Sequence, residues 1–297
     1  MHGGIEMQNN KSKKFAVIAN KKARNAQKIN NYTERFAQAH LEFDLFLVEP
    51  QLLRDTIDSC HQKYPLVLVA GGDGTVRTAA QICAHSPCTL GILPLGTLNH
   101  FAKELNLPIT PDEMIEAINA HHTKQIDLAK VNEFIFVNNS SIGFYPRFAQ
   151  KRDELSKSYN KWLSYIPSFF QVLKHHPKYQ VSLTNNQLNM TFKTSFLMIS
   201  NNLYSHKFPL TIERERFDAA ELGIYVYKKG KLSLKKIINL LFRRPQDLQI
   251  EKTSLPLEIK VQQQTKIRIA LDGDTEETNN PLCYSILPGA LKVLVKK

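Results

Sequence analysis

Several features that would assign this chain to a class at once are missing from its sequence. No apolar run reaches the roughly 18 residues that a membrane-spanning helix needs. The opening stretch, MHGGIEMQNNKSKK, is polar and lacks the apolar centre of a secretory signal, so we expect residues 1–13 to be a disordered leader. His2 stands where N-myristoylation requires glycine, which argues against that anchor.

Cysteine is also scarce. The chain has 4 cysteines, at positions 60, 83, 88 and 283, and none of them form a Cys-x-x-Cys pair. We therefore expect reduced thiols and a cytoplasmic protein. Two familiar nucleotide-binding fingerprints are absent as well: the P-loop GxxxxGK[ST], and a GxGxxG after the first predicted strand.

Acidic residues are outnumbered, with 27 Asp and Glu against 39 Lys and Arg, which gives a net charge of +12. Such an excess favours an anionic partner, for example nucleic acid, an acidic membrane surface or a phosphorylated ligand. A solvated basic surface explains the charge equally well, because net charge says nothing about the fold.

The first part of the chain alternates short apolar runs with helical spacing. The predicted strands are Phe15–Ala19, Phe43–Val48, Leu66–Ala70 and Thr89–Leu93. Helices are predicted at 22–40, 52–57, 76–83 and 98–105, and a further one opens at Pro111. Strands that alternate with helices predict a parallel sheet covered on both faces.

After about residue 124 strands follow one another directly, which predicts a β-sandwich. The predicted strands are Gln125–Val131, Phe134–Asn138, Tyr179–Leu183, Met190–Ser200, Leu222–Tyr227, Leu257–Val261 and Lys266–Leu271. The last two alternate apolar and polar residues and are joined by QQQT, so we expect them to form an antiparallel hairpin. Two segments with helical patterns, at about 145–175 and 232–242, interrupt the strands.

The stretch VLVAGGDGTVRTAAQ, residues 67–81, places three glycines around one acid where a strand ends and a helix begins. Ligands of parallel α/β sheets bind at such strand ends. Glycines let the backbone approach a phosphate or take a positive φ, and a helix N-terminus favours anions. Asp73 then fits as a magnesium ligand or as the acceptor of a proton from an attacking hydroxyl. A tight turn with Asp73 as helix cap is the alternative.

A second stretch, GILPLGTLNHFAKEL at 91–105, repeats this pattern on the next strand. The strand ends at Pro94, and Gly96-Thr97 leads into a helix. Two neighbouring strand ends, each with Gly-Thr before a helix, are suited to bind one triphosphate from two sides.

GGDGT followed by PLGTLNHFAKEL closely resembles the diacylglycerol kinase catalytic-domain family, which contains soluble bacterial lipid kinases and the sphingosine kinases. Four later segments stand in the family's order: IDLAKVN at 126–132, FVNNSSIGF at 136–144, LDGD at 271–274 and LPGALKVLV at 287–295. The resemblance implies an α/β plus all-β fold. Its parts are a parallel-sheet ATP-binding domain over 14–128 with a return strand at about 288–297, and a β-sandwich lipid-substrate domain with helical insertions over 129–287.

The resemblance further implies ATP- and Mg²⁺-dependent phosphorylation of the hydroxyl of diacylglycerol or a similar membrane lipid. The residues implied to bind ATP are Asn20, Gly71, Gly72, Asp73, Gly74, Thr75, Gly96 and Thr97. The implied catalytic residues are Asp73 and Asp274, the latter at the position of the family's proposed base, and the implied metal ligands are Asp73, Asp127 and Asp218. Asp127 as an exposed strand-edge acid, and Asp272-Gly273-Asp274 as a simple turn, are the alternatives.

The chain departs from the family pattern in four places. The first loop reads Asn20-Lys21-Lys22-Ala23-Arg24 instead of Asn-Pro and a glycine, so Lys22 or Arg24 could meet phosphate directly. His100 stands where the family commonly has an acidic residue, directly after the asparagine of the second motif. Ala219 and Ala220 occupy an Asp-Gly pair that many members tie to a structural magnesium, and Asp218 is one residue early. Asp274 replaces glutamate and is one methylene shorter.

The expected partner is a membrane lipid reached by transient docking on an anionic surface, at the inner membrane face of the cytoplasm, and not nucleic acid. The segment 145–176 combines basic and aromatic residues, which suits such a surface. An ordinary helix packed on the sandwich is the alternative interpretation, and an oligomer is compatible with the sequence.

Two other functions stay open. An NAD kinase or a phosphofructokinase-like kinase would share GGDG, although PLGTLNHF argues against both. A regulator that binds lipid or nucleotide without catalysis is compatible with His100, Ala219 and Asp274.

Overall fold

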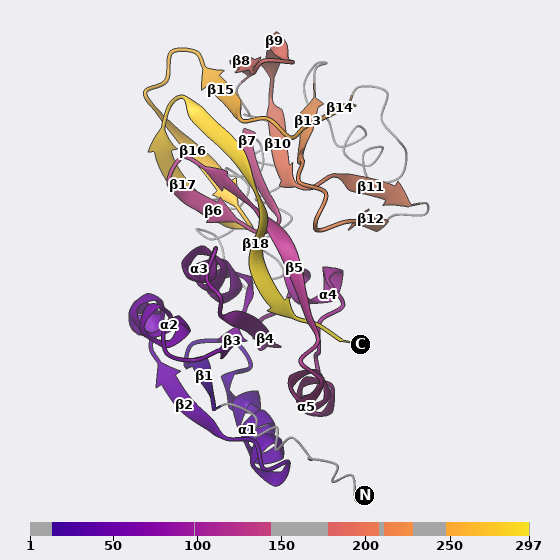
Figure 1. Ribbon diagram of the computed structural model, residues 1–297. Helices are drawn as coiled ribbons and strands as arrows, with labels where there is room; N and C mark the ends of the chain where they lie inside the picture. Colours follow the sequence, from indigo (N-terminus) through magenta and orange to yellow (C-terminus); the bar gives the residue numbers. More distant parts are fainter. Residues whose placement is uncertain (1–13, 98, 144–177, 208–210, 228–247, 297) are drawn as a thin grey trace, which may run out of the picture. The chain divides into compact units, whose positions relative to one another are not determined.

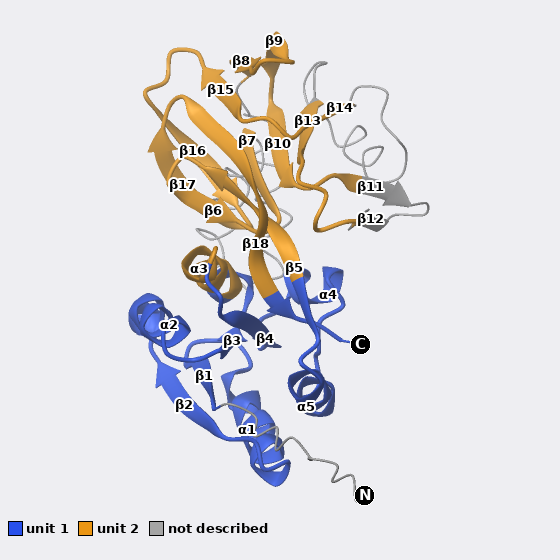
Figure 2. Ribbon diagram, viewed as in Figure 1, with its two compact units in different colours: residues 1–75, 86–124, 293–297 blue, residues 76–85, 125–292 orange. Residues whose placement is uncertain are grey.

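The computed structural model describes residues 14–97, 99–143, 178–207, 211–227 and 248–296 (Figure 1). The chain divides into two compact units (Figure 2). Unit 1 comprises Met1–Thr75, Ser86–Lys124 and Val293–Lys297, and unit 2 comprises Val76–His85 and Gln125–Lys292. The predicted leader and both predicted helical insertions, at 145–175 and 232–242, lie outside the described residues.

Unit 1 is built on a parallel sheet with the strand order β2-β1-β3-β4. The strands are β1 (Phe15–Asn20), β2 (Phe43–Val48), β3 (Leu66–Gly71) and β4 (Thr89–Pro94). The end of β18 (Leu282–Leu294) adds a further parallel partner, because Val293 pairs with Leu90 of β4. All four predicted strands are confirmed. Such near-continuous apolar runs are typical of a parallel sheet, whose two faces are both covered.

Helices cover the sheet of unit 1 and bury its side chains. The helical elements are η1 (Ala26–Lys28), α1 (Ile29–Gln38), η2 (Pro50–Leu52), α2 (Leu53–His61), α4 (His100–Glu104) and α5 (Pro111–Ala120). Phe15, Val17 and Ala19 of β1 belong to one core cluster with α1 and α5. Helix α2 contacts β1, β2 and β3, and none of its side chains belongs to this cluster. Because strand side chains alternate between the two faces of a sheet, α2 covers the opposite face.

Helix α3 (Asp73–Cys83) begins with the last residues of unit 1 and continues as the first segment of unit 2. Its predicted apolar face is confirmed: the side chains of Val76, Ala79, Ala80 and Cys83 are buried. The helix predicted for 22–40 begins later than expected, because Asn25 uses its backbone N–H to bond the carbonyl of Leu95 and so belongs to a loop.

Unit 2 is a sandwich of two sheets. Its strands are β5 (Thr123–Val131), β6 (Phe134–Phe136), β7 (Asn139–Gly143), β8 (Tyr179–Thr184), β9 (Asn189–Thr194), β10 (Phe196–Asn201), β11 (Tyr204–Lys207), β12 (Thr211–Arg214), β13 (Leu222–Tyr227), β14 (Leu248–Thr253), β15 (Leu257–Val261), β16 (Lys266–Leu271), β17 (Asp274–Asn279) and β18. One sheet has the order β18-β15-β8-β9, with β5 on β18 and β6 on β5, and the other has the order β14-β13-β10-β7-β16-β17. The core cluster takes side chains from both sheets, which confirms the predicted sandwich.

Two predictions for the strands of this unit are wrong: one concerns strand pairing and the other the extent of a strand. The expected hairpin of 257–261 with 266–271 does not form: β15 pairs with β18 and β8, whereas β16 pairs with β17 and β7 in the other sheet. Alternating apolar residues show that a strand has one buried face, but they do not identify its neighbours. The single strand predicted for 190–200 is two strands, β9 and β10, which lie in different sheets on either side of Ser195.

Among the residues that the structure describes, none of the helices has the length and apolar character to cross a membrane.

Candidate phosphate-binding loops and catalytic hairpin

Three loops of unit 1 meet where the parallel strands end. The backbone N–H of Leu95, just after β4, donates to the carbonyl of Gly71 at the end of β3 (2.9 Å). Asn25, in the loop after β1, donates its backbone N–H to Leu95 O (3.1 Å) and its side-chain Nδ2 to Gly96 O (3.2 Å). The segments that contain the predicted ATP-binding residues are therefore linked directly to one another.

The glycines of these loops are needed for close packing. A Cβ added to Gly96 would lie 2.5 Å from the Cα of Gly72, and one added to Gly71 would lie 2.3 Å from Thr75 Oγ1. None of these three glycines has a positive φ. Of the two reasons for glycine that the sequence suggests, close approach of the backbone therefore applies here.

Polar side chains extend the contact between the loops. Asn20 Nδ2 donates to Thr75 Oγ1 (3.4 Å), and Asn20 Oδ1 accepts from the backbone N–H of Lys22 (2.9 Å). The exposed Arg24 donates from Nη1 to Thr97 Oγ1 (3.3 Å). The structure thus brings together Asn20, Thr75 and Thr97, which the resemblance assigned to ATP, and adds Arg24 to them.

Two residues that shape this site were missed in the sequence. Asn99 adopts a left-handed backbone (φ 49°) and accepts from the N–H of Gly96 through Oδ1 (2.9 Å). Its Nδ2 donates to Pro94 O (3.3 Å) and Gly96 O (3.2 Å). Asn25 holds the same loop from the other side. The asparagine close to Gly-Thr is a sequence signal for such a loop-holding residue, since Asn tolerates the left-handed backbone and hydrogen-bonds nearby backbone amides.

Asp73 is the first residue of α3, and one of its carboxylate oxygens is buried without a hydrogen bond. Nothing in the described part of the chain donates to Oδ1. A buried acceptor left unpaired costs free energy, so its retention suits a group that receives a cation or a donor from a ligand. Asp73 therefore fits the predicted magnesium ion, and Oδ1 does not act as a helix cap.

Asp272 and Gly273, for which the sequence offered a simple turn as the alternative, form a tight turn between β16 and β17. Both residues have positive φ (50° and 99°), as the two-residue turns that join antiparallel strands require, and Leu271 pairs with Asp274. Asp272 accepts backbone N–H groups from Val137 (2.8 Å), Asn138 (2.7 Å) and Asn139 (3.1 Å).

Burial raises the pKa of Asp272, while these three amides oppose the shift. The carboxylate of Asp272 thus has a structural task within the turn. Asp274 is the exposed first residue of β17, and its role as base stays a prediction.

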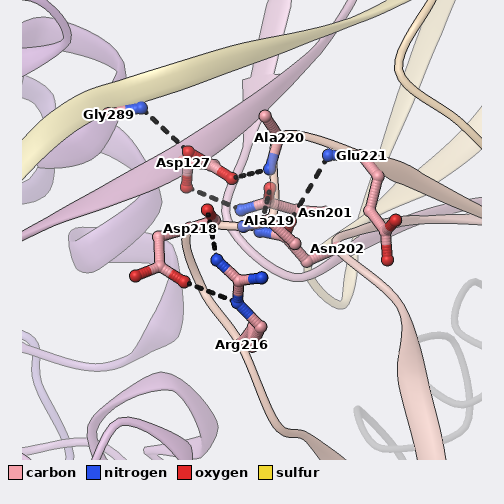
Figure 3. A network of polar contacts seen from close by, with 9 residues as sticks. All are labelled: Asp127, Asn201, Asn202, Arg216, Asp218, Ala219, Ala220, Glu221 and Gly289. Carbon is pink, nitrogen blue, oxygen red and sulfur yellow. Dashed lines mark hydrogen bonds and ion pairs between the residues drawn. The ribbon is translucent and has the colours of Figure 1, made fainter.

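Asp127 is buried, which excludes the alternative of an exposed edge acid: it is 2% exposed. Its Oδ2 accepts from the backbone N–H of Ala220 (2.7 Å) and its Oδ1 from that of Gly289 (2.8 Å), as Figure 3 shows. Asn201 Nδ2 donates to the backbone carbonyl of Asp127 (2.8 Å). Asp127 therefore joins three distant segments of unit 2, and its predicted link to magnesium through water stays a prediction.

The surroundings of Asp218 do not fit a structural magnesium. The carboxylate accepts from Arg216 Nε (3.2 Å), and Asn202 Oδ1 accepts from the N–H of Ala219 (3.1 Å) (Figure 3). Ala220 adopts the left-handed backbone that glycine usually takes (φ 53°). No group of three or more His, Cys, Asp or Glu side chains that could hold a metal occurs among the described residues.

Comparison with known proteins agrees with these features. Residues 14–131 match the family model of the diacylglycerol kinase catalytic domain. A candidate lipid kinase of Staphylococcus carnosus is 30% identical over 176 residues, which are 58% of this chain and 57% of that protein. A protein of Staphylococcus haemolyticus named diacylglycerol kinase is 25% identical over 248 residues, which are 82% of this chain and 71% of that protein.

Solved structures support the fold independently. The crystal structure of a candidate diacylglycerol kinase from Bacillus anthracis has a TM-score of 0.77 at 23% identity, and the match covers 96% of this chain and 98% of that one. The family match includes both glycine motifs and all three loops that meet in unit 1. Residues 14–131 are therefore similar to the catalytic domain of the diacylglycerol kinases.

Proposed function

We propose that the protein is an ATP-dependent lipid kinase, which phosphorylates the hydroxyl of diacylglycerol or a similar membrane lipid. The observation that carries this proposal is the packing of two Gly-Thr loops against each other at Gly72 and Gly96, at the ends of neighbouring parallel strands. Loops of this kind, followed by helices, bind phosphate through backbone N–H groups. Relatives named as lipid kinases support the choice of acceptor.

The loop residues would hold the phosphates of ATP. Lys21, Lys22 and Arg24 are exposed beside the loop after β1, and Arg24 is already held by Thr97. Arginine binds phosphate oxygens through paired, charge-assisted hydrogen bonds. Mg²⁺ held by Asp73 would neutralise charge that develops on the phosphates during transfer.

Asp274 would orient the lipid hydroxyl and accept its proton. The residue is exposed, and its neighbour Asp272 is occupied by backbone amides. A carboxylate that positions the attacking hydroxyl is the usual protein contribution to phosphoryl transfer, which relies mainly on placement and charge.

We further propose that the protein works in the cytoplasm and docks transiently on the anionic inner face of the membrane. The lipid acceptor requires access to a bilayer, and the net charge of +12 favours an acidic surface. Nucleic acid is not among the proposed partners.

The test is a phosphorylation screen with labelled ATP and Mg²⁺ against a panel of lipids in mixed micelles, with NAD as a separate acceptor. Label transferred to a lipid hydroxyl by the wild type, and lost in Asp73→Asn, is the expected result. Label on NAD instead would favour an NAD kinase. ATP binding without transfer to any acceptor would favour a non-catalytic regulator.

A further inference from the structure

Arg77 forms a half-buried ion pair that the proposed chemistry does not use. It lies on α3, one turn after Asp73, and its Nη2 is 2.5 Å from Oε1 of Glu276 on β17. The two side chains are only 15% and 30% exposed. A second guanidinium nitrogen, Nη1, donates to the backbone carbonyl of Leu271 (3.3 Å).

Through these two contacts, Arg77 binds both strands of the hairpin close to its turn, β16 at Leu271 and β17 at Glu276. Leu271 is the last residue of β16 and pairs with Asp274, and Glu276 is two residues beyond Asp274 on β17. Because side chains of a strand alternate, Asp274 and Glu276 lie on the same face of β17. That face is the one that Arg77 contacts through Glu276.

The turn itself is anchored separately. Asp272 accepts the N–H groups of Val137, Asn138 and Asn139, so the turn is tied to the segment that leads into β7 and to its first residue. Arg77 adds a connection to α3, and its positive charge favours the ionised form of Asp272. The hairpin is thus tied at its turn by backbone amides and along its strands by one arginine.

We propose that Arg77 is a positioning residue, which fixes the hairpin of Asp274 to the part of α3 that belongs to unit 2. This inference rests on the proposed function, in which Asp274 orients the lipid hydroxyl. A planar guanidinium with two partners restricts orientation more than a single bond does. Displacement of a reacting group by about 1 Å can lower a rate by about 10²-fold, so such a restraint matters for turnover.

Stability alone does not account for the pair. Desolvation of the two charges in a half-buried ion pair offsets much of their attraction, so such a pair often adds little to the free energy of unfolding. The same hairpin carries a second pair, Lys266 with Glu277 (3.5 Å), whose side chains are 65% and 53% exposed. Glu277 is therefore a matched control: it stands beside Glu276, carries the same charge and makes an exposed contact.

The kinetic test compares Arg77→Met, Glu276→Gln and the double variant with the control Glu277→Gln. We expect either single variant to lower kcat about 10-fold or more, with KM for ATP within about twofold of the wild type, because the phosphate loops are unchanged. The double variant should be no slower than the slower single variant, since both changes remove one interaction. Wild-type kcat in both single variants would overturn the proposal.

Amide hydrogen exchange gives a result that does not depend on turnover. Residues 272–276 should exchange faster in Arg77→Met and in Glu276→Gln than in the wild type or in Glu277→Gln. Unchanged exchange in both would overturn the inferred restraint even if kcat fell. If the wild type phosphorylates no lipid, the proposed function fails, and exchange alone then decides whether Arg77 holds the hairpin.

Discussion

At the scale of single residues, the three acids that the family resemblance assigned to magnesium have three different environments. Asp73 keeps a buried oxygen without a donor among the described residues, Asp127 is occupied by two backbone amides, and Asp218 is paired with Arg216. Residue type alone does not separate these cases, because a carboxylate accepts equally well from an amide, an arginine or a metal. The unpaired oxygen singles out Asp73 as the acid available to a ligand.

Replacement of Asp73 by asparagine should abolish phosphoryl transfer without loss of stability. The buried oxygen accepts no hydrogen bond from the described residues, so the replacement breaks no contact of that oxygen while it removes the proposed magnesium ligand. We expect the melting temperature, measured by calorimetry without Mg²⁺, to equal or exceed that of the wild type. Near-normal turnover by the purified variant would contradict the assigned role.

Asp274→Asn should lower kcat by about 10²-fold or more, the usual scale of general acid–base help. ATP affinity should change little, because Asp274 is assigned to the acceptor. Asp274→Glu should keep measurable activity, since it restores the acid that the family has at this position. Steady-state kinetics on a confirmed lipid substrate check both variants, and normal turnover by Asp274→Asn would mean that the base lies elsewhere.

At the scale of elements, prediction succeeded where the signal is local and failed where distant partners decide. The strands of the parallel sheet follow from continuous apolar runs, and the glycine loops from their position at strand ends. Strand β7 was missed because its sequence, NSSIG, is polar, and its buried Ser140 bonds the hydroxyl of Tyr284 (2.9 Å). Burial of Asp127 could not be inferred either, because its amide donors lie 93 and 162 residues away.

The start of α5 offers a pH test of one element. Glu113 accepts the backbone N–H groups of Ile109 (2.8 Å) and Thr110 (3.1 Å) and pairs with Lys296 (2.9 Å). The amide of Ile109 first, and then Lys296, lower the pKa of Glu113 from 4.5 to about 2. Because the pKa is lower in the folded state, this stabilisation is present above pH 4.5 and is lost as the pH falls towards 2.

Glu113→Gln should therefore have a lower free energy of unfolding than the wild type at pH 7, and the difference should shrink as the pH falls below about 4.5. Urea unfolding at a series of pH values measures the difference, with Glu116→Gln, an exposed acid of the same helix, as the control. A difference that is constant from pH 7 to pH 3 would show that Glu113 is not held as its charged form.

At the scale of the whole molecule, charge is the property that the sequence determines without any knowledge of the fold. The chain carries 39 basic against 27 acidic side chains. If this excess serves docking on a membrane, the interaction must respond to ionic strength, since exposed charges are screened over about 10 Å at 0.1 M salt. A basic surface with no such role would show no preference between lipid mixtures.

Binding to liposomes should rise with the fraction of anionic lipid and fall as salt is added. Co-sedimentation with vesicles of phosphatidylcholine alone and with increasing phosphatidylglycerol measures this, at low salt and at 0.5 M or so of salt. Equal binding to neutral and anionic vesicles would exclude electrostatic docking on the membrane.

The path of the chain through unit 1 also sets an order of events during synthesis on the ribosome. The unit begins with β1, yet it includes residues 293–297, where Val293 pairs with Leu90 and Val295 donates its backbone N–H to His122 O (2.9 Å). The N-terminal sheet therefore lacks a strand until translation has passed residue 293, long after its first four strands have left the exit tunnel. Until then, the edge of β4 that pairs with β18 in the complete protein has no partner from this segment.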